Sequence, residues 1–115
     1  MADLVVYEKP TCTTCRRLSA LLAERGIDAE RVDYHVTGLS DQQIRGLLAK
    51  AGVGPREILR TREPAYAEHV AGRDLGDDEL IALMAAHPQL VQRPIVVRGD
   101  RAVLARPVER VLELL

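Results

Sequence analysis

The 115-residue sequence contains no tryptophan and no phenylalanine, and only 3 tyrosines. Its core therefore has to be built from Leu, Val, Ile and Ala, which defines the packing and says nothing about function. Long apolar runs are also missing: none approaches the ~20 residues that cross a bilayer, and Met1-Ala2-Asp3 lacks the basic start of a signal peptide. We therefore expect a cytoplasmic protein with no membrane partner.

An excess of charge of one sign is lacking as well. The formal net charge is -1, and the basic residues are spread along the chain without a lysine-rich tail or stripe. This distribution disfavours direct binding of nucleic acid, which needs a concentrated basic surface. With 47% hydrophobic and 29% charged residues, the chain has the size and balance of one domain, and we expect residues 1–115 to form a single domain.

Cysteine is scarce, since the chain has only Cys12 and Cys15. They follow an apolar run at residues 4–7 and precede a helical pattern over residues 13–25, so a strand leads into a helix through the cysteines. A sulfur at a helix N-terminus faces unpaired N–H groups, and such thiols have pKa values of roughly 3.5–7.5. We expect Cys12 to be an ionised nucleophile and Cys15, which is more enclosed, to be its resolving or redox partner.

Three other roles compete for these cysteines. A zinc site needs further ligands, but the histidines lack the paired spacing of zinc ligands, and we expect no bound metal. A structural disulfide across so short a segment adds little stability. Burial as a small hydrophobic side chain suits Cys15 better than Cys12, whose neighbours are polar.

The remaining patterns predict strands towards both ends of the chain and helices between them. The predicted strands are residues 3–8, 30–34, 93–98 and 102–105, the last two joined by a Gly99-Asp100-Arg101 turn. The predicted helices or helical turns are residues 13–25, 40–52 with a Ser40–Gln43 capping box, 55–59, 64–69, 77–87 and 107–115. A turn is expected at residues 35–38. The expected core faces are Leu80, Leu83, Met84 and His87 in one helix, and Val108, Val111, Leu112 and Leu115 in the last.

This order is β-α-β, a helical insert at about residues 38–90, then β-β-α. A strand, a helix and a second strand form a parallel pair and the hairpin is antiparallel, so we expect an α/β fold with a mixed four-stranded sheet. The connectivity resembles that of a thioredoxin-like domain with the cysteines after its first strand. That resemblance implies a cis bond before Pro94, beside the thiols, whereas the general frequency of about 5–6% would favour trans.

Four segments resemble the glutaredoxin-linked arsenate reductase family and the related Spx-like redox regulators. They are Pro10-Thr11-Cys12, Ile58-Leu59-Arg60-Thr61-Arg62-Glu63, Gln92-Arg93-Pro94-Ile95-Val96-Val97 and Ala105-Arg106-Pro107. The resemblance implies that Cys12 attacks arsenic. It also implies that Arg60, Arg93 and Arg106 bind the arsenate oxyanion, with Thr13 and Thr14 at the helix start as further contacts. Arginine is abundant in this chain, so a solvated surface role is the default for any one of the three.

The chain departs from these reductases at Thr13-Thr14-Cys15, where they commonly have Gly-Thr-Ser. We expect no bound cofactor, and a thiol reductant as co-substrate. A single-cysteine reductase depends on glutathione with glutaredoxin, whereas Cys15 could resolve the intermediate internally and pass the disulfide to a thioredoxin-type donor. The Cys-x-x-Cys form is closer to the Spx-like regulators, so a redox switch that binds RNA polymerase stays open as an alternative. A general thiol-disulfide oxidoreductase is a further alternative.

Overall fold

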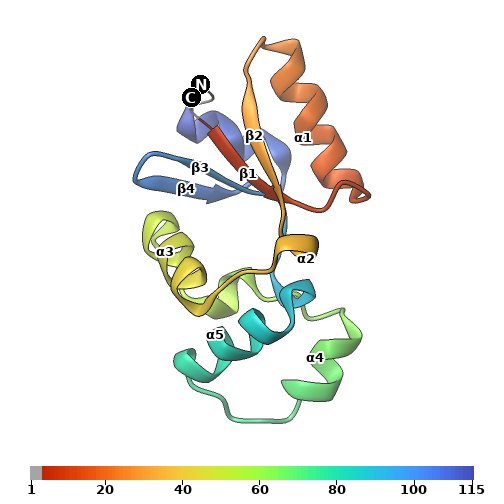
Figure 1. The fold of residues 1–115 in the computed structure, drawn as a ribbon, viewed down its shortest axis with the longest axis vertical. Helices are drawn as coiled ribbons and strands as arrows, with labels where there is room; N and C mark the ends of the chain where they lie inside the picture. The colour runs from red at the N-terminus through yellow and green to blue at the C-terminus, as the bar shows by residue number, and fades with distance from the viewer. Residues whose placement is uncertain (1–3) are drawn as a thin grey trace.

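The structure is a computed structural model that describes residues 4–115. A four-stranded sheet has the order β2-β1-β3-β4. Its strands are β1 (Leu4–Glu8), β2 (Ala29–Asp33), β3 (Ile95–Arg98) and β4 (Arg101–Leu104). β1 is parallel to β2 and antiparallel to β3, and β3 is antiparallel to β4. The mixed α/β sheet predicted from the sequence is therefore confirmed, in a thioredoxin-like order (Figure 1).

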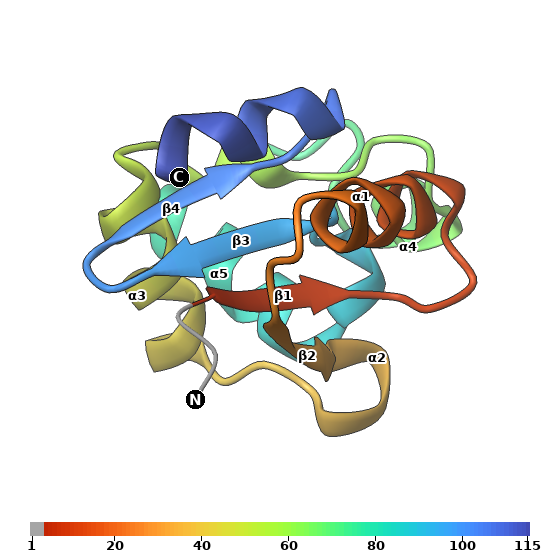
Figure 2. The ribbon, with the colours of Figure 1, turned by 90° about the horizontal axis from the view of Figure 1, so that it is seen from above.

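One face of the sheet is covered by α1 (Thr13–Glu24) and the 3₁₀ helix η3 (Val108–Leu114). Seen from above, both lie over the strands (Figure 2). Aliphatic side chains from these helices and from three strands form a buried cluster there: Leu4, Val6, Leu18, Leu22, Val96, Val103, Ala105, Val111 and Leu114. Burial of this layer fixes α1, and with it the cysteine segment, against the end of β1.

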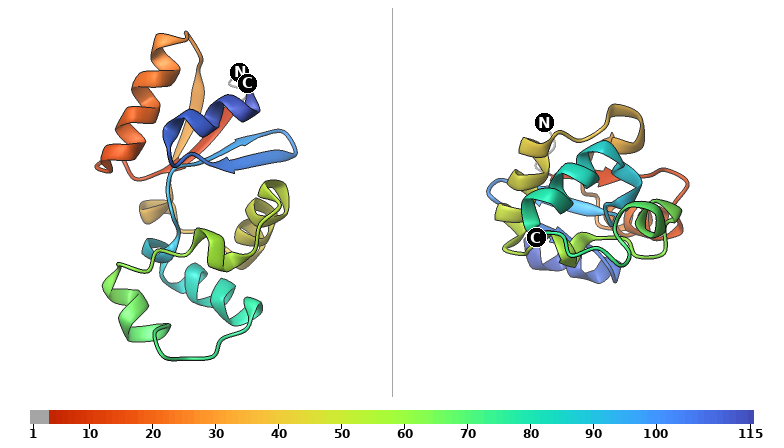
Figure 3. Two further views of the ribbon diagram at one scale, coloured as in Figure 1. Left: turned by 180° about the vertical axis from the view of Figure 1, so that it is seen from behind. Right: turned by 90° about the horizontal axis from the view of Figure 1, so that it is seen from below.

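A block of helices covers the other face (Figure 3). It consists of α2 (Tyr34–Thr37), α3 (Asp41–Ala51), η1 (Pro55–Ile58), α4 (Pro64–His69), α5 (Asp77–Ala86) and η2 (Pro88–Leu90). The predicted capping box is present, since Ser40 Oγ accepts from the Gln43 N–H at 3.0 Å and Gln43 Oε1 accepts from the Ser40 N–H at 2.8 Å. In this block the described chain forms one isolated bridge, Leu59 with Val91, and no strand.

Several predicted boundaries differ from the structure. Residues 35–38 are not a simple turn, because Tyr34 opens the one-turn helix α2 and the Asp33 carboxylate accepts from the His35 N–H at 3.2 Å. β2 consequently ends one residue early. Helix α5 ends at Ala86, so His87 is not on its core face. The hairpin strands begin at Ile95 and Arg101, and the predicted Asp3 start of β1 lies outside the described residues.

The predicted core face of the last helix is wrong in two places. Leu112 and Leu115 are 40% and 43% exposed, whereas Leu114 is 5% exposed. The physical reason is the period. The segment is a 3₁₀ helix with three residues per turn, so every third side chain, at positions 108, 111 and 114, lies on the same side. The sequence prediction used the α-helical period of 3.6 residues, which places Leu112 and Leu115 on the core face.

No helix in residues 4–115 is long and apolar enough to span a membrane.

Candidate active site

Three connections meet at one edge of the sheet. β1 ends at Glu8 next to the start of β3, because Tyr7 pairs with Ile95 in antiparallel register. Ile95 also pairs with Leu104, the last residue of β4. The segments after β1, before β3 and after β4 therefore converge. They carry Cys12, Arg93 and Arg106, respectively.

Cys12 occupies the N-cap position of α1, with an extended backbone (φ -76°, ψ 129°). Burial acts to raise the pKa of Cys12. Hydrogen bonds outweigh the effect of burial and lower the pKa to about 7. They come from the backbone N–H and the thiol of Cys15, from the Arg93 guanidinium and from the backbone N–H of Thr14. A thiol with this pKa is about half ionised at neutral pH and is a competent nucleophile. The low pKa predicted for Cys12 thus has the predicted cause, the helix start, together with one arginine.

Cys15 has the opposite character. It is 1% exposed and lies on the core side of the first turn of α1. Burial raises the pKa of Cys15 to about 12, and the charges of Cys12 and Glu8 add to the effect. Both cysteines are free thiols. At neutral pH the pair therefore combines one thiol that is about half ionised with one that stays protonated.

Arg93 is the arginine that faces the sulfur. It is 7% exposed, and its Nε and Nη1 atoms are buried without a hydrogen-bond partner. No carboxylate within residues 4–115 forms an ion pair with it. Its neighbours are the Tyr34 hydroxyl and the Cys12 thiol. A buried guanidinium left with free donors is costly, so this position is suited to an anion that enters from outside.

Arg106 reaches the same region from the end of β4. Its Nη1 donates to the Arg93 carbonyl oxygen at 2.8 Å, which ties the two arginine segments together. Arg106 also lines a hollow of about 160 Å³ that it shares with Thr14 and Arg17 of α1. The side chain is exposed. The Arg106 guanidinium can therefore bond to the Arg93 segment and also lie close to the start of α1.

The predicted site residues differ in how closely they are associated with Cys12. Arg60 forms an ion pair with Glu63, at 3.1 Å from Nε to Oε1, and donates through Nη1 to Gln92 Oε1 at 3.3 Å. The charge of Arg60 acts to lower the pKa of Tyr34, and Arg60 is not one of the main groups that shift the pKa of Cys12. Thr13 is the exposed first residue of α1, whereas the backbone N–H of Thr14 acts on the sulfur.

Two prolines border the arginines. The Arg93–Pro94 and Arg106–Pro107 peptide bonds are both cis. The first is the isomer that the resemblance implied for Pro94, and the second was not anticipated from the sequence.

The sequence reasoning missed residues around this site. Tyr34 is fully buried, donates to the Val91 carbonyl at 2.6 Å and faces Arg93. His35 stacks on Tyr34 with ring centroids 4.7 Å apart, and both of its ring nitrogens are buried without a partner. Burial, with the charges of Arg93 and Lys9, lowers the pKa of His35. Glu8 is buried at the end of β1. A charged residue closing an otherwise apolar strand, directly before the cysteines, was the signal available for Glu8.

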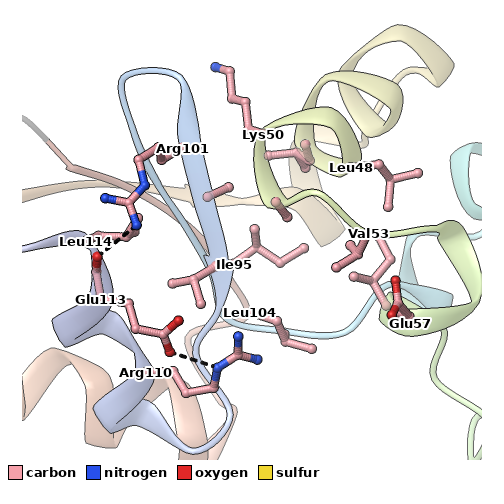
Figure 4. A pocket seen from close by; sticks show the side chains of 15 residues that line it. Leu48, Lys50, Val53, Glu57, Ile95, Arg101, Leu104, Arg110, Glu113 and Leu114 are labelled. Atoms are coloured by element: carbon pink, nitrogen blue, oxygen red, sulfur yellow. Dashed lines mark hydrogen bonds and ion pairs between the residues drawn. The ribbon is translucent and has the colours of Figure 1, made fainter.

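A cavity of about 420 Å³ lies away from the cysteines, between α3, β4 and η3. Figure 4 shows aliphatic side chains such as Leu48, Val53 and Leu104 around it, with the Arg110–Glu113 ion pair at one side. None of the candidate site residues lines it. Among the described residues, no group of three or more His, Cys, Asp or Glu side chains is arranged to hold a metal ion.

Comparison with known proteins assigns the chain to a family. Residues 7–114 match the ArsC family. The chain is 32% identical over 115 residues to an arsenate reductase of Haemophilus influenzae, covering 98% of this chain and 99% of that protein. It is 37% identical over 111 residues to the uncharacterized protein YfgD of Escherichia coli, covering 95% and 93%.

A solved structure of an arsenate reductase from Vibrio cholerae has a TM-score of 0.92 and 38% identity, covering 97% of each chain. The likeness thus includes the sheet and the helical block, not only the cysteine segment. With a family match over nearly the whole length and relatives above 30% identity, this chain belongs to the ArsC family.

Proposed function

We propose that this ArsC-family chain is a thiol-dependent oxidoreductase that reduces arsenate, with Cys12 as the nucleophile. The observation that carries the proposal is the buried Arg93 guanidinium beside Cys12, whose Nε and Nη1 donors have no partner. Arsenate is a tetrahedral oxyanion whose oxygens match those donors. Relatives that match the full chain are arsenate reductases, which supports the same substrate.

In the proposed first step, the Cys12 thiolate attacks arsenic and displaces one oxygen, which leaves as water after protonation. Arg93 and the N–H groups of Thr14 and Cys15 stabilise the negative charge on the oxygens that remain. Arg106 holds the Arg93 segment in place through its bond to the Arg93 carbonyl. Arg60 is an outer member of the site, because its charge is already balanced by Glu63.

In the second step a thiolate attacks Cys12 Sγ, and the electron pair of the S–As bond passes to arsenic. Arsenic is reduced by two electrons and leaves as arsenite, while the two sulfurs are oxidised to a disulfide. Cys15 is the nearest thiol, three residues along the same helix start. A thioredoxin-type donor then reduces the Cys12–Cys15 disulfide. With glutathione as the attacking thiol, glutaredoxin would reduce the mixed disulfide instead.

Turnover of arsenate with two reductant systems tests the proposal. Wild type should release arsenite with thioredoxin and thioredoxin reductase as the reductant system. Cys12→Ser should be inactive with every donor. Cys15→Ser should lose the thioredoxin-coupled reaction and keep activity with glutathione and glutaredoxin.

The outcome that overturns the proposal is absence of arsenite formation by wild type with both donors. If the Cys12–Cys15 disulfide nevertheless forms and changes the binding of a protein partner such as RNA polymerase, the redox-switch function replaces the enzyme. If the disulfide forms and exchanges with protein thiols in general, the chain is a thiol-disulfide oxidoreductase without an oxyanion substrate.

A further inference from the structure

β4 is an edge strand, since the strand order of the sheet ends with it and β3 is its neighbour. In an antiparallel pair, successive residues alternate between bonding to the partner strand and pointing their N–H and C=O groups the other way. The Ala105 N–H donates to the Pro94 carbonyl oxygen at 2.9 Å, which fixes that alternation. Residues 101, 103 and 105 therefore bond towards β3, and the backbone groups of Ala102 and Leu104 point away from the sheet.

Three of these outward backbone groups have no partner. The Leu104 carbonyl oxygen accepts from the Arg106 N–H at 2.9 Å. Within residues 4–115, no group bonds to the Leu104 N–H or to the N–H and C=O of Ala102. The edge thus presents a donor, an acceptor and a second donor in line, which is complementary to the backbone of an extended chain.

The cavity of about 420 Å³ follows this edge. All four residues of β4, Arg101–Leu104, line it. Because successive side chains of a strand point to opposite faces of the sheet, a cavity that touches all four follows the edge rather than one face. Its other lining residues come from α3 and η1 on one side of the sheet and from η3 on the other. β4 is therefore the floor of a groove between α3 and η3, which we call the edge groove (Figure 4).

The edge groove is aliphatic in its middle and cationic at one end. Leu48 of α3 and Val53 form the aliphatic part, and Lys50 and Arg101 lie together at one end (Figure 4). Neither cation forms an ion pair within the described residues. Arg101 Nη2 donates to the Glu113 carbonyl oxygen at 3.1 Å, which leaves the charge of Arg101 unbalanced. This end of the groove is suited to acidic side chains.

The other charged residues lie at the opposite end of the groove. Arg110 Nε is 3.1 Å from Glu113 Oε2, so these two charges balance each other. Glu57 Oε2 accepts from the Gly54 N–H at 2.7 Å and has no cationic partner in the described chain. The groove is therefore polarised along its length, with positive charge at the end beside the β3–β4 turn and the Glu57 carboxylate at the other.

We propose that an extended segment of a partner protein adds to β4 as a fifth strand in the edge groove. Its acidic residues lie at the Lys50–Arg101 end, and an aliphatic side chain lies between the walls. Main-chain bonds to Ala102 and Leu104 supply affinity, and the side-chain contacts supply selectivity. At ~3.3 Å per residue, β4 accommodates a segment of about four residues. None of the candidate active-site residues lines the groove, so this inference is independent of the proposed function.

A second copy of this chain fits the edge groove less well. The copy carries its own β4 on the floor of the same groove, so the walls of the two copies meet before the two edges do. An extended segment without walls can reach the free N–H and C=O groups.

The test begins with a library of random short peptides selected for binding to the wild-type chain. Selected peptides should combine alternating β-branched residues with Asp or Glu at one end. Ala102→Pro removes the outward N–H and keeps every bond to β3, a position where edge strands tolerate proline. The affinity of the selected peptides for Ala102→Pro should fall about tenfold or more, because a hydrogen bond is lost and the ring occupies the place of the peptide.

Two further measurements examine charge and strand pairing. Lys50→Glu should weaken the acidic peptides about tenfold, and forms of these peptides with lysine in place of the acids should prefer Lys50→Glu to wild type. Arg25→Glu, a charge reversal at the exposed C-terminal end of α1, is the matched control and should change neither affinity. Methylation of one peptide amide nitrogen at a time should abolish binding at alternate positions only, since alternate N–H groups face β4.

The proposal is overturned if no peptide is selected that depends on the groove, or if the selected peptides bind Ala102→Pro as well as wild type. Loss of binding without the alternation in the methylated series also overturns it. A dimer in sedimentation equilibrium that Ala102→Pro dissociates would show that a second copy occupies the edge, which refutes the partner segment. Thermal unfolding shows whether Ala102→Pro folds. Should it unfold, the methylated peptides with wild type and the charge reversal at Lys50 decide.

Discussion

The difference in ionisation between the two cysteines can be measured directly. With a pKa of about 7, Cys12 is about half ionised at pH 7, whereas the ordinary value of 9.0 would leave about 1% as thiolate. Since only the thiolate reacts with iodoacetamide, Cys12 should be alkylated at pH 7 some 50-fold faster than its ordinary pKa would allow, before correction for intrinsic nucleophilicity. The correction is towards a smaller factor, because nucleophilicity falls with pKa.

The assay uses the single-cysteine variants. In Cys15→Ser, the alkylation rate of Cys12 should rise with pH as a titration curve with its midpoint near 7, because the thiolate fraction grows through the pKa. In Cys12→Ser, Cys15 should be nearly unreactive below pH 9, because it is 1% exposed and protonated. Equal reactivity of the two thiols at neutral pH would refute the assignment of Cys12 as nucleophile.

Three further predictions address the anion site and the fold. Arg93→Ala should weaken arsenate or sulfate binding about 10- to 100-fold in a titration, since losing a charge-assisted hydrogen bond costs about 1.5–3 kcal/mol. Arg98→Ala, the control, should leave the binding unchanged. Equal effects of the two substitutions would show that Arg93 does not bind the anion. Leu114→Ala should destabilise the fold by about 2–5 kcal/mol in urea and Leu112→Ala by less than about 1 kcal/mol; the reverse order would contradict the 3₁₀ period of η3. Ser40→Ala should cost about 0.5–2 kcal/mol through the lost capping box, and an unchanged urea midpoint would show that the cap contributes nothing.

The elements that carry local signals could be predicted from the sequence. The Ser40 capping box, the glycine after it at position 52 and the cysteines at a strand-helix junction each have a short-range cause, and all three are present. The last helix failed because α and 3₁₀ periods select different leucines in a short segment, and tertiary packing decided between them. The spacing of apolar residues in so short a segment does not distinguish an α-helix from a 3₁₀ helix.

The candidate site also combines residues with a local signal and residues that only long-range contacts bring together. Cys12 could be identified from its position in the chain, and the arginines only from resemblance. Arg93 faces Cys12 because Tyr7 pairs with Ile95, which is a long-range contact that no sequence spacing reveals. Glu8 and Tyr34 were overlooked because the sequence pattern makes each of them the last residue of a predicted strand. Their burial became visible only when α1 and the helical block were in place.

The presence of Cys15 gives this chain a choice of reductant that a single-cysteine reductase does not have. When Cys15 attacks Cys12 Sγ, the product is an internal disulfide, which a thioredoxin-type donor can reduce. In thioredoxin-coupled arsenate turnover, Cys15→Ser should therefore lose most of the activity, and with glutathione and glutaredoxin as donors it should keep activity. An equal loss with both donors would mean that Cys15 supports the fold or Cys12 and has no specific part in the resolving step.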